Sequence, residues 1–312
     1  MSSRRTFIKQ LALGGGGLAS MTLLPLRSFA YPKKNYTKLT ILHTNDVHSH
    51  IEPFPVNDPK YPGLGGAARR ASVIQQIRNE EQNVLLLDAG DIFQGTPYFN
   101  LYGGEIDFKL MSLMQYDAAT IGNHDFDNGI EGLEKMLPHA NFPFINSNYD
   151  FSNTVMHGKT LPHKIFDKDG IKVGVFGVGV ELEGLVSKDL YQETIYNDPV
   201  EAAGKQATFL KEEEKCDLVI CLSHLGYSYK TRKVSDLILA EQTSHIDLII
   251  GGHTHTFLDT PTKVKNQSGK VTLINQVGWA GINLGRIDFY VSTDKTNYSF
   301  SSERITLTQK TF

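Results

Sequence analysis

The sequence predicts an α/β fold in which two sheets pack face to face with helices outside them. Short apolar runs alternate with segments of helical periodicity, and this strand, helix, strand order repeats along the chain. The late segments are richer in strand-like patterns, which favours two sheets over one. The 312 residues are 40% hydrophobic and 21% charged, which excludes a disordered chain, collagen and a coiled coil.

The elements follow from these patterns in chain order. The apolar runs predict buried strands over residues 39–42, 84–87, 118–121, 144–146, 218–222 and 248–250. Helical periodicity predicts helices over residues 67–79, 106–115, 130–137, 200–215 and 232–241. Turn residues predict hairpins that join 164–167 to 173–178 and 262–265 to 271–275, and residues 286–292 and 304–307 also favour strands. No repeat or low-complexity linker interrupts the series, so we expect a single domain.

The first thirty residues differ from the rest of the chain. They contain no Asp or Glu, and Arg4-Arg5 precede an apolar, glycine-rich run from Leu11 to Leu26. This pattern resembles a bacterial twin-arginine signal peptide. The run is short and interrupted by glycines and a proline, so we expect no stable membrane anchor. We therefore expect residues 1–30 to be a signal, residues 31–312 to form the domain, and the protein to be periplasmic or extracellular.

The charge excludes one class of partner. The formal net charge is −3, and without the four basic residues of the expected signal the other 282 residues carry −7. A nucleic-acid partner would require a basic surface, so we expect none. Any phosphate that this protein handles must be bound by something other than an excess of Lys and Arg. Cys216 and Cys221 lie too far apart along one strand to pair, so we expect two buried thiols.

Polar residues of a few types follow the expected strands. Ligands of α/β sheets bind outside the carboxyl ends of strands, so these residues should meet at one place. They are Asp46 and His48 after the first strand, Asp91 after the second, Asn123 and His124 after the third, and His224, His253 and His255 after the two later ones.

These residue types indicate a metal site. Carboxylate, imidazole and amide groups suit divalent Zn, Mn, Fe or Co. Seven candidate ligands are too many for one tetrahedral ion, but if Asp91 bridges, each of two ions has four. Two ions about 3.5–4 Å apart can lower the pKa of a water and hold the oxygens of a phosphoryl group. The metals would also supply the positive field that this acidic chain lacks.

Five blocks of sequence resemble the calcineurin-like metallophosphoesterases, and within them the catalytic domain of the 5'-nucleotidase family. The blocks are LTILHTNDVH from Leu39, GGAAR from Gly65, GDIFQG from Gly90, GNHDFD from Gly122 and GHTH from Gly252. The resemblance implies a four-layer α/β/β/α sandwich with a dinuclear centre. It also implies the ligand sets: Asp46, His48, Asp91 and His255 for one ion, and Asp91, Asn123, His224 and His253 for the other.

The resemblance further implies the chemistry. A metal-bound hydroxide attacks phosphorus in line, Asn123 and His124 contact the substrate, and His124 stabilises the phosphoryl charge or protonates the leaving oxygen. The nucleotidase pattern makes Asp127 the residue that orients His124, with Asp125 as the competing choice. His43 and His50 lie beside the first ligand pair and have no ligand position in the family.

These features predict an exported phosphate-monoester hydrolase, with a 5'-nucleotide as the favoured substrate. Full-length nucleotidases carry a C-terminal domain that binds the base; we expect it to be absent here, and Trp279 and Tyr290 to pack within strands. A separately encoded chain is one way to complete the substrate site. The alternatives are a 2',3'-cyclic-nucleotide phosphodiesterase, a thiosulfohydrolase, or a metal-stabilised binding subunit of a two-chain nucleotidase.

Overall fold

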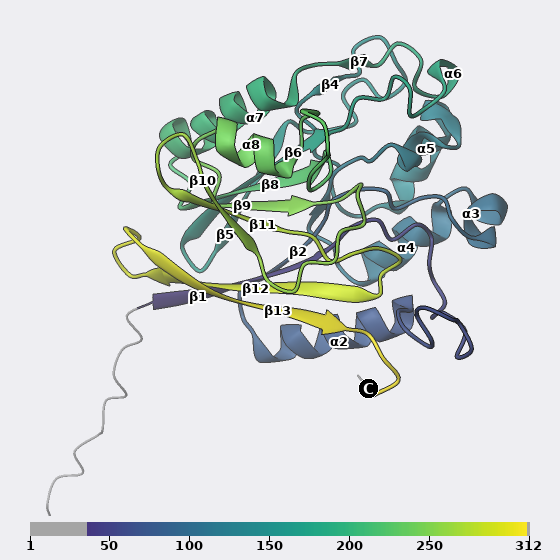
Figure 1. The fold of residues 1–312 in the computed structure, drawn as a ribbon, viewed down its shortest axis with the longest axis horizontal. Coiled ribbons are helices and arrows are strands. Elements are labelled where there is room, and N and C mark those ends of the chain that lie inside the picture. Colours follow the sequence, from purple (N-terminus) through teal and green to yellow (C-terminus); the bar gives the residue numbers. More distant parts are fainter. Residues whose placement is uncertain (1–35, 311–312) are drawn as a thin grey trace, which may run out of the picture. The chain divides into compact units, whose positions relative to one another are not determined.

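A computed structural model describes residues 36–310, so the expected signal at residues 1–30 lies outside the described part. Two large sheets lie face to face (Figure 1). The first has the strand order β13-β12-β1-β2-β3, in which β1, β2 and β3 are parallel and β12 and β13 run antiparallel to their neighbours. Its strands are β1 (Tyr36–Thr44), β2 (Val84–Asp88), β3 (Ala118–Ala119), β12 (Asn283–Ser292) and β13 (Tyr298–Thr306).

The second sheet has the order β10-β11-β9-β8-β6-β5. Its four inner strands are parallel, and the strands at both edges pair antiparallel, as expected for the two hairpins. The strands are β5 (His163–Lys168), β6 (Ile171–Gly179), β8 (Leu218–His224), β9 (Leu248–Gly251), β10 (Thr262–Lys265) and β11 (Val271–Asn275). A separate pair joins β4 (Tyr149–Asp150) to β7 (Ile195–Tyr196).

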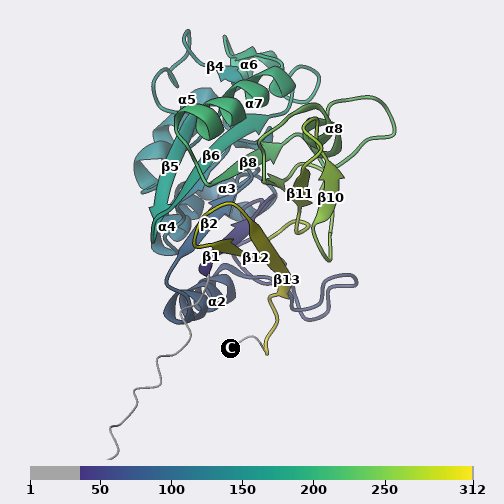
Figure 2. The ribbon, with the colours of Figure 1, turned by 90° about the vertical axis from the view of Figure 1, so that its left-hand side faces the viewer.

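Helices cover the outer face of each sheet, as the turned view shows (Figure 2). Residues of α2, α3, α4 and α5 pack on the first sheet, and residues of α7 and α8 pack on the second. The helices are α2 (Ala67–Glu80), α3 (Pro97–Tyr102), α4 (Glu105–Leu113), α5 (Gly129–Met136), α6 (Lys188–Tyr191), α7 (Pro199–Thr208) and α8 (Asp236–Gln242). Within the described residues, no helix is long and apolar enough to cross a membrane.

Neighbouring residues of one strand belong to different layers. In β2, Leu85 lies in the core between the sheets and Leu86 faces the helices of the first sheet. In β8, Ile220 lies between the sheets and Val219 packs beneath the outer helices of the second sheet. Because both faces of these strands are buried, their sequences are continuous apolar runs instead of alternating ones. The fold is therefore the expected four-layer α/β/β/α sandwich.

Most expected elements are confirmed, and the differences have local causes. Residues 144–146 form only isolated bridges, because Phe144 pairs with Ala119 while Ile145 pairs with Leu161 on another segment. The helix expected from residue 232 begins at Asp236, where the Ser235 side chain accepts a hydrogen bond from the backbone N–H of Ile238. The helix over 200–215 ends as an α-helix at Thr208 and continues as one π-helical turn.

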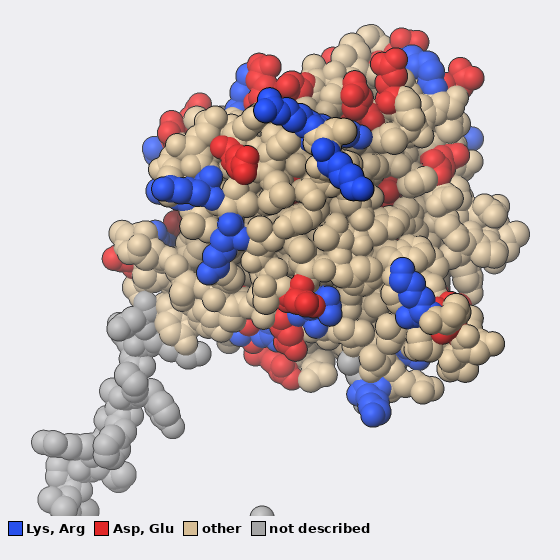
Figure 3. Space-filling model, in the orientation of Figure 1, with Lys and Arg blue, Asp and Glu red and all other residues tan. Residues whose placement is uncertain are grey.

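The cysteines agree with expectation, and the visible surface carries both signs of charge. Lys and Arg are interspersed with Asp and Glu on the face shown in Figure 3. Cys216 and Cys221 are both buried free thiols.

Candidate metal centre

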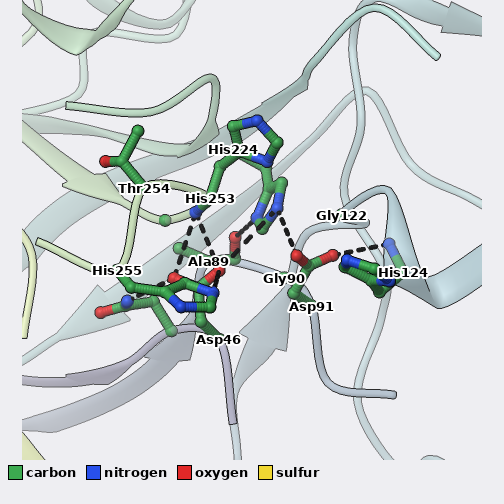
Figure 4. A network of polar contacts seen from close by, with 12 residues as sticks. Asp46, Ala89, Gly90, Asp91, Gly122, His124, His224, His253, Thr254 and His255 are labelled. Atoms are coloured by element: carbon green, nitrogen blue, oxygen red, sulfur yellow. Dashed lines mark hydrogen bonds and ion pairs between the residues drawn. The ribbon is translucent and has the colours of Figure 1, made fainter. Parts of the chain in front are cut away.

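Six of the seven expected ligands form two triads where loops of the first sheet meet loops of the second, and Asn123 directly precedes His124 beside them. Asp46 and His48 follow β1, Asp91 follows β2 and Asn123 follows β3, all in the first sheet. His224 ends β8, and the GHTH segment that carries His253 and His255 follows β9, both in the second sheet. Five of these side chains, with Asp91 between His224 and His124, are seen in Figure 4.

The first triad consists of Asp46, His48 and His255, whose ligand atoms lie within 4.8 Å of one another. The Nε2 atoms of His48 and His255 are 3.0 Å apart, and His255 Nε2 is 3.6 Å from Asp46 Oδ1. The His48 ring is fixed from behind, since its Nδ1 lies 3.1 Å from the Phe93 carbonyl oxygen. Three donor atoms thus face one point.

The second triad consists of Asp91, His224 and His253. His224 Nε2 is 3.0 Å from Asp91 Oδ2, and His224 Nδ1 lies 2.7 Å from the Ala89 carbonyl oxygen. The same Asp91 Oδ2 lies 3.8 Å from His48 Nε2 of the first triad. Asp91 is thus a member of the second triad that also faces the first triad, as a ligand shared by two ions would.

The donor set fits two divalent ions. Ligand atoms around a tetrahedral ion bound at about 2.0–2.2 Å lie roughly 3.4 Å apart, close to the spacings found here. Asn123 Oδ1 and His224 Nε2 are buried atoms without a hydrogen-bond partner, the latter approaching Asp91 without hydrogen-bond alignment. Such orphaned acceptors are costly unless something binds them. A divalent cation at each triad would satisfy them.

Burial and mutual contact shift the pKa values of the ionisable groups in this cluster. Burial raises the pKa of Asp46 to about 8, and burial lowers the pKa of His253 to about 3. Burial also opposes the charged form of His224, but the Asp91 and Asp46 carboxylates outweigh it and raise its pKa to about 10. Without metal the cluster keeps protons that bound cations would displace, so metal binding is expected to release protons.

The backbone at the ligands adopts a conformation that most residues avoid. Five of the seven expected ligands have positive φ: Asp46 at 50°, His48 at 52°, Asp91 at 54°, His253 at 71° and His255 at 50°. For a residue other than glycine this costs on the order of 1 kcal/mol. Strain concentrated in this way indicates that the loops are shaped to aim these side chains at one place.

A glycine next to Asn123 permits the close approach of the ligands. A Cβ on Gly122 would lie 2.2 Å from Asp91 Oδ1 and 2.7 Å from His224 Cε1. Both contacts are far inside van der Waals distance. The glycine of the GNHDFD block is therefore required by the packing of the second triad against this loop.

His124 and its carboxylate neighbour lie beside the two triads. His124 Nδ1 is 2.8 Å from Asp127 Oδ2, and its ring centroid is 5.3 Å from that of His48. The hydrogen bond that His124 donates to the Asp127 carboxylate raises the pKa of His124. Asp125, the competing choice, is turned away: its carboxylate accepts the backbone N–H groups of Gly122 and residues 91–93. Asp125 thus ties the loop after β3 to the loop after β2.

Two histidines near the first ligand pair hold the surroundings in place. His43 is fully buried, and its Nε2 lies 2.9 Å from Asn275 Nδ2. His50 stacks on Phe54, with ring centroids 5.0 Å apart. Neither belongs to the two triads.

Sequence reasoning missed an aromatic neighbour of the centre. Tyr290 lies in β12 as expected, but Trp279 lies in the loop between β11 and β12 instead of a strand. Its ring stacks on His255, with centroids 5.4 Å apart and parallel planes. The glycines at 278 and 281 both have positive φ, and this pair was the available signal for a loop. No local pattern could predict that Trp279 contacts His255, because the two residues lie far apart in the sequence.

Comparison with known proteins places the chain in a family. A family model described as calcineurin-like phosphoesterase matches residues 39–257. The chain belongs to this family. Among its relatives, the trifunctional nucleotide phosphoesterase protein YfkN of Bacillus subtilis is 35% identical over 306 residues, which cover 86% of this chain and 19% of the relative. The snake venom 5'-nucleotidase of Crotalus adamanteus is 36% identical over 286 residues, which cover 85% of this chain and 47% of the relative.

Solved structures of the family share the fold. The 5'-nucleotidase precursor from Thermus thermophilus matches with a TM-score of 0.80 and 32% identity, covering 88% of this chain and 55% of the other. This phosphoesterase chain spans less than half the length of both curated relatives described above.

Proposed function

We propose that this protein is an exported dinuclear-metal phosphoesterase that hydrolyses phosphate monoesters, with 5'-nucleotides as the favoured substrates. The observation that carries the proposal is the pair of triads, with Asp91 of the second facing His48 of the first and with His124 and Asp127 beside them. Similarity to YfkN and to 5'-nucleotidases supports nucleotides as the substrate class. The signal-like sequence of residues 1–30 supports export.

The residues that would hold the ions form two sets. The first set is Asp46, His48, Asp91 and His255, and the second is Asp91, Asn123, His224 and His253. Zn, Mn, Fe or Co would each suit these donors. Bound there, the ions would lower the pKa of a water and polarise the phosphoryl oxygens.

His124 is placed to act on the leaving group. Its Nδ1–H donates to the Asp127 carboxylate, so the other ring nitrogen, Nε2, is left for the substrate. Because this carboxylate raises the pKa of His124, the ring keeps its second proton to higher pH than a free histidine would. In this role His124 stabilises the phosphoryl charge or donates its Nε2 proton to the departing oxygen.

The main chain connects this acid to the shared carboxylate. The backbone N–H of His124 donates to Asp91 Oδ1 at 2.8 Å, while Asp91 Oδ2 faces His224 and His48. One oxygen of Asp91 thus fixes the position of His124, and the other serves the triads. The neighbouring Asn123 would contribute its unpaired Oδ1 to the same end of the site.

The test combines metal analysis with a substrate panel. The purified chain is assayed for bound metals and for hydrolysis of nucleoside 5'-monophosphates, sugar phosphates, 2',3'-cyclic nucleotides and thiosulfonate conjugates. We expect two ions per chain and preferred release of phosphate from the nucleotides. Asn123→Ala should lose about a hundredfold or more in kcat/KM, whereas Asn79→Ala, an exposed asparagine at the far end of α2, should match the wild type.

Each other result has a definite meaning. Equal activity in Asn123→Ala would refute the dinuclear mechanism. Preference for cyclic diesters or thiosulfonates would replace the proposed substrate class. Two bound ions without turnover would favour a binding subunit. Turnover only in preparations from native cells that contain a second chain would show that this partner contributes to the substrate site.

A further inference from the structure

The imidazoles of the two triads are held in different ways. His48 and His224 each have Nδ1 against a main-chain carbonyl, at 3.1 Å and 2.7 Å, which fixes the ring and its tautomer. His255 makes no such hydrogen bond within residues 36–310. Its side chain is 38% exposed and follows a strained backbone with φ of 50°. Some other contact must keep this ring in a ligating orientation.

That contact is the indole of Trp279. The two rings are parallel, with an interplanar angle of 0° and centroids 5.4 Å apart. Trp279 also meets the His48 ring edge-on at 6.5 Å. Both contacts are with the first triad. Among the described residues, no ring contact joins Trp279 to the second triad, whose histidine rings meet each other at 5.3 Å.

The indole is itself fixed by its neighbours. The rings of His50, Phe54 and Tyr61 lie around it at 5.3 Å, 5.9 Å and 6.2 Å, all steeply inclined to its plane. Its Nε1–H points to the Tyr61 hydroxyl at 3.5 Å. These contacts leave the indole little room to rotate, so the indole can restrict the orientation of the His255 ring that stacks on it.

The loop that carries Trp279 is tied to the first ligand loop. The buried side chain of Asn45 donates from Nδ2 to the Gly278 carbonyl oxygen at 2.6 Å and to Asp46 Oδ2 at the same distance. The backbone N–H of Ala280 donates to the Asp46 carbonyl oxygen at 2.7 Å. Trp279 and Asp46 therefore keep a fixed separation, and His255 lies against the indole.

We propose that Trp279 is a positioning residue for the metal centre, which holds the His255 ring in place and makes the first triad dependent on it while the second triad is not. This inference rests on the dinuclear centre of the proposed function. Contacts that orient a metal ligand are typically worth 10–100-fold in metal affinity. An imidazole bound to a cation is also more positive, which strengthens its attraction to the face of an indole.

Metal affinity tests this role without any assay of turnover. The full chain, stripped with a chelator, is titrated with Mn²⁺, and bound metal is measured at equilibrium by dialysis and elemental analysis. We expect the wild type to bind two ions. Trp279→Leu should bind one ion as the wild type does and the other about 10–100-fold more weakly. Trp279→Phe keeps a ring against His255 and should stay near the wild type.

The chain supplies its own reporter and its own control. Trp279 is the single tryptophan of the sequence, so the fluorescence of the wild type should change as the first triad fills with Mn²⁺. Tyr290→Leu removes an aromatic ring from β12, outside the centre, and should bind both ions as the wild type does. Thermal melting checks that each variant is folded.

Three outcomes would overturn the proposal. A folded Trp279→Leu that binds both ions with wild-type affinity would do so, and so would a wild-type fluorescence that stays constant while two ions bind. The fluorescence result is measured on the wild type, so it tests the proposal even if Trp279→Leu does not fold. A wild type that binds no Mn²⁺ would remove the dinuclear centre as well as this proposal, whereas the first two outcomes leave the proposed function intact.

Discussion

The two triads are built alike and supported differently. Each takes its carboxylate from a loop of the first sheet and at least one imidazole from the second sheet. In the second triad, main-chain carbonyl and ring contacts hold His224. In the first, His48 has a carbonyl partner but His255 stacks on an indole. The comparison shows that the centre forms where loops of the two sheets meet, and that Asp91 of the second triad also faces His48 of the first.

Removal of Asp91, the proposed shared ligand, should have the largest effect. Asp91→Asn takes the carboxylate charge from the second triad and from the side of the first triad that His48 faces, so we expect fewer than two bound ions and a loss of roughly a thousandfold or more in kcat/KM. Metal analysis measures the number of bound ions, and the rate of phosphate release measures kcat/KM. Asp117→Asn, at the amino end of β3, is the matched control and should keep both ions. Normal turnover in Asp91→Asn would show that the triads do not depend on one shared ligand.

Loss of His124 should separate chemistry from metal binding. His124→Asn removes the proposed proton donor, and we expect kcat to fall about 10²–10⁴-fold with two ions still bound. The measurement is kcat together with metal content on the same sample. A variant that loses metal instead would place His124 among the supports of the triads and not in the reaction.

A methyl group on Gly122 should disturb the second triad directly. Because the added Cβ would meet Asp91 Oδ1 at 2.2 Å and His224 Cε1 at 2.7 Å, we expect Gly122→Ala to weaken metal binding and to lower kcat/KM by roughly 10–100-fold. Gly204→Ala is the matched change, since nothing lies within 4 Å of its added Cβ on α7. It should keep full activity and gain about 0.5–1 kcal/mol of stability. Equal metal affinity and equal kcat/KM in Gly122→Ala and Gly204→Ala would contradict the close packing of the centre.

The smallest expected effect is a change in pH dependence. The hydrogen bond that His124 donates to Asp127 raises the pKa of His124, so the protonated form, which is the proposed acid, persists to higher pH. In Asp127→Asn that support is lost, the pKa falls, and the alkaline limb of the kcat profile should move to lower pH. The positive charge of bound metals acts on both proteins alike, so the difference between them remains. An unchanged alkaline limb would mean that another group sets it.

The sequence predicted which polar residues lie together because these residues follow the ends of strands. Asp46, Asp91 and His224 each follow an apolar run that is buried on both faces, so the runs located the strands and the strand ends located the residues of the two triads. The layer order followed from the same runs together with the family resemblance. This part of the architecture is encoded locally.

What the sequence did not reveal depends on contacts between distant segments. The contact of Trp279 with His255 exists because the loop after β11 is hydrogen-bonded to Asn45 and Asp46, far away in the chain. The segment at Phe144 has a strand-like composition, but its backbone divides its bonds between two neighbours and forms no ladder. A local pattern of apolar residues predicts neither the ring contact of Trp279 nor the missing strand at Phe144.

The central claim is that two metal ions share Asp91. Electron paramagnetic resonance of the chain loaded with Mn²⁺ tests it most directly, because ions about 3.5–4 Å apart with a common ligand couple magnetically. We predict two ions per chain with the spectrum of a coupled pair, and loss of the coupling in Asp91→Asn. A single bound ion, or two ions that give only the spectrum of isolated Mn²⁺, would contradict the account.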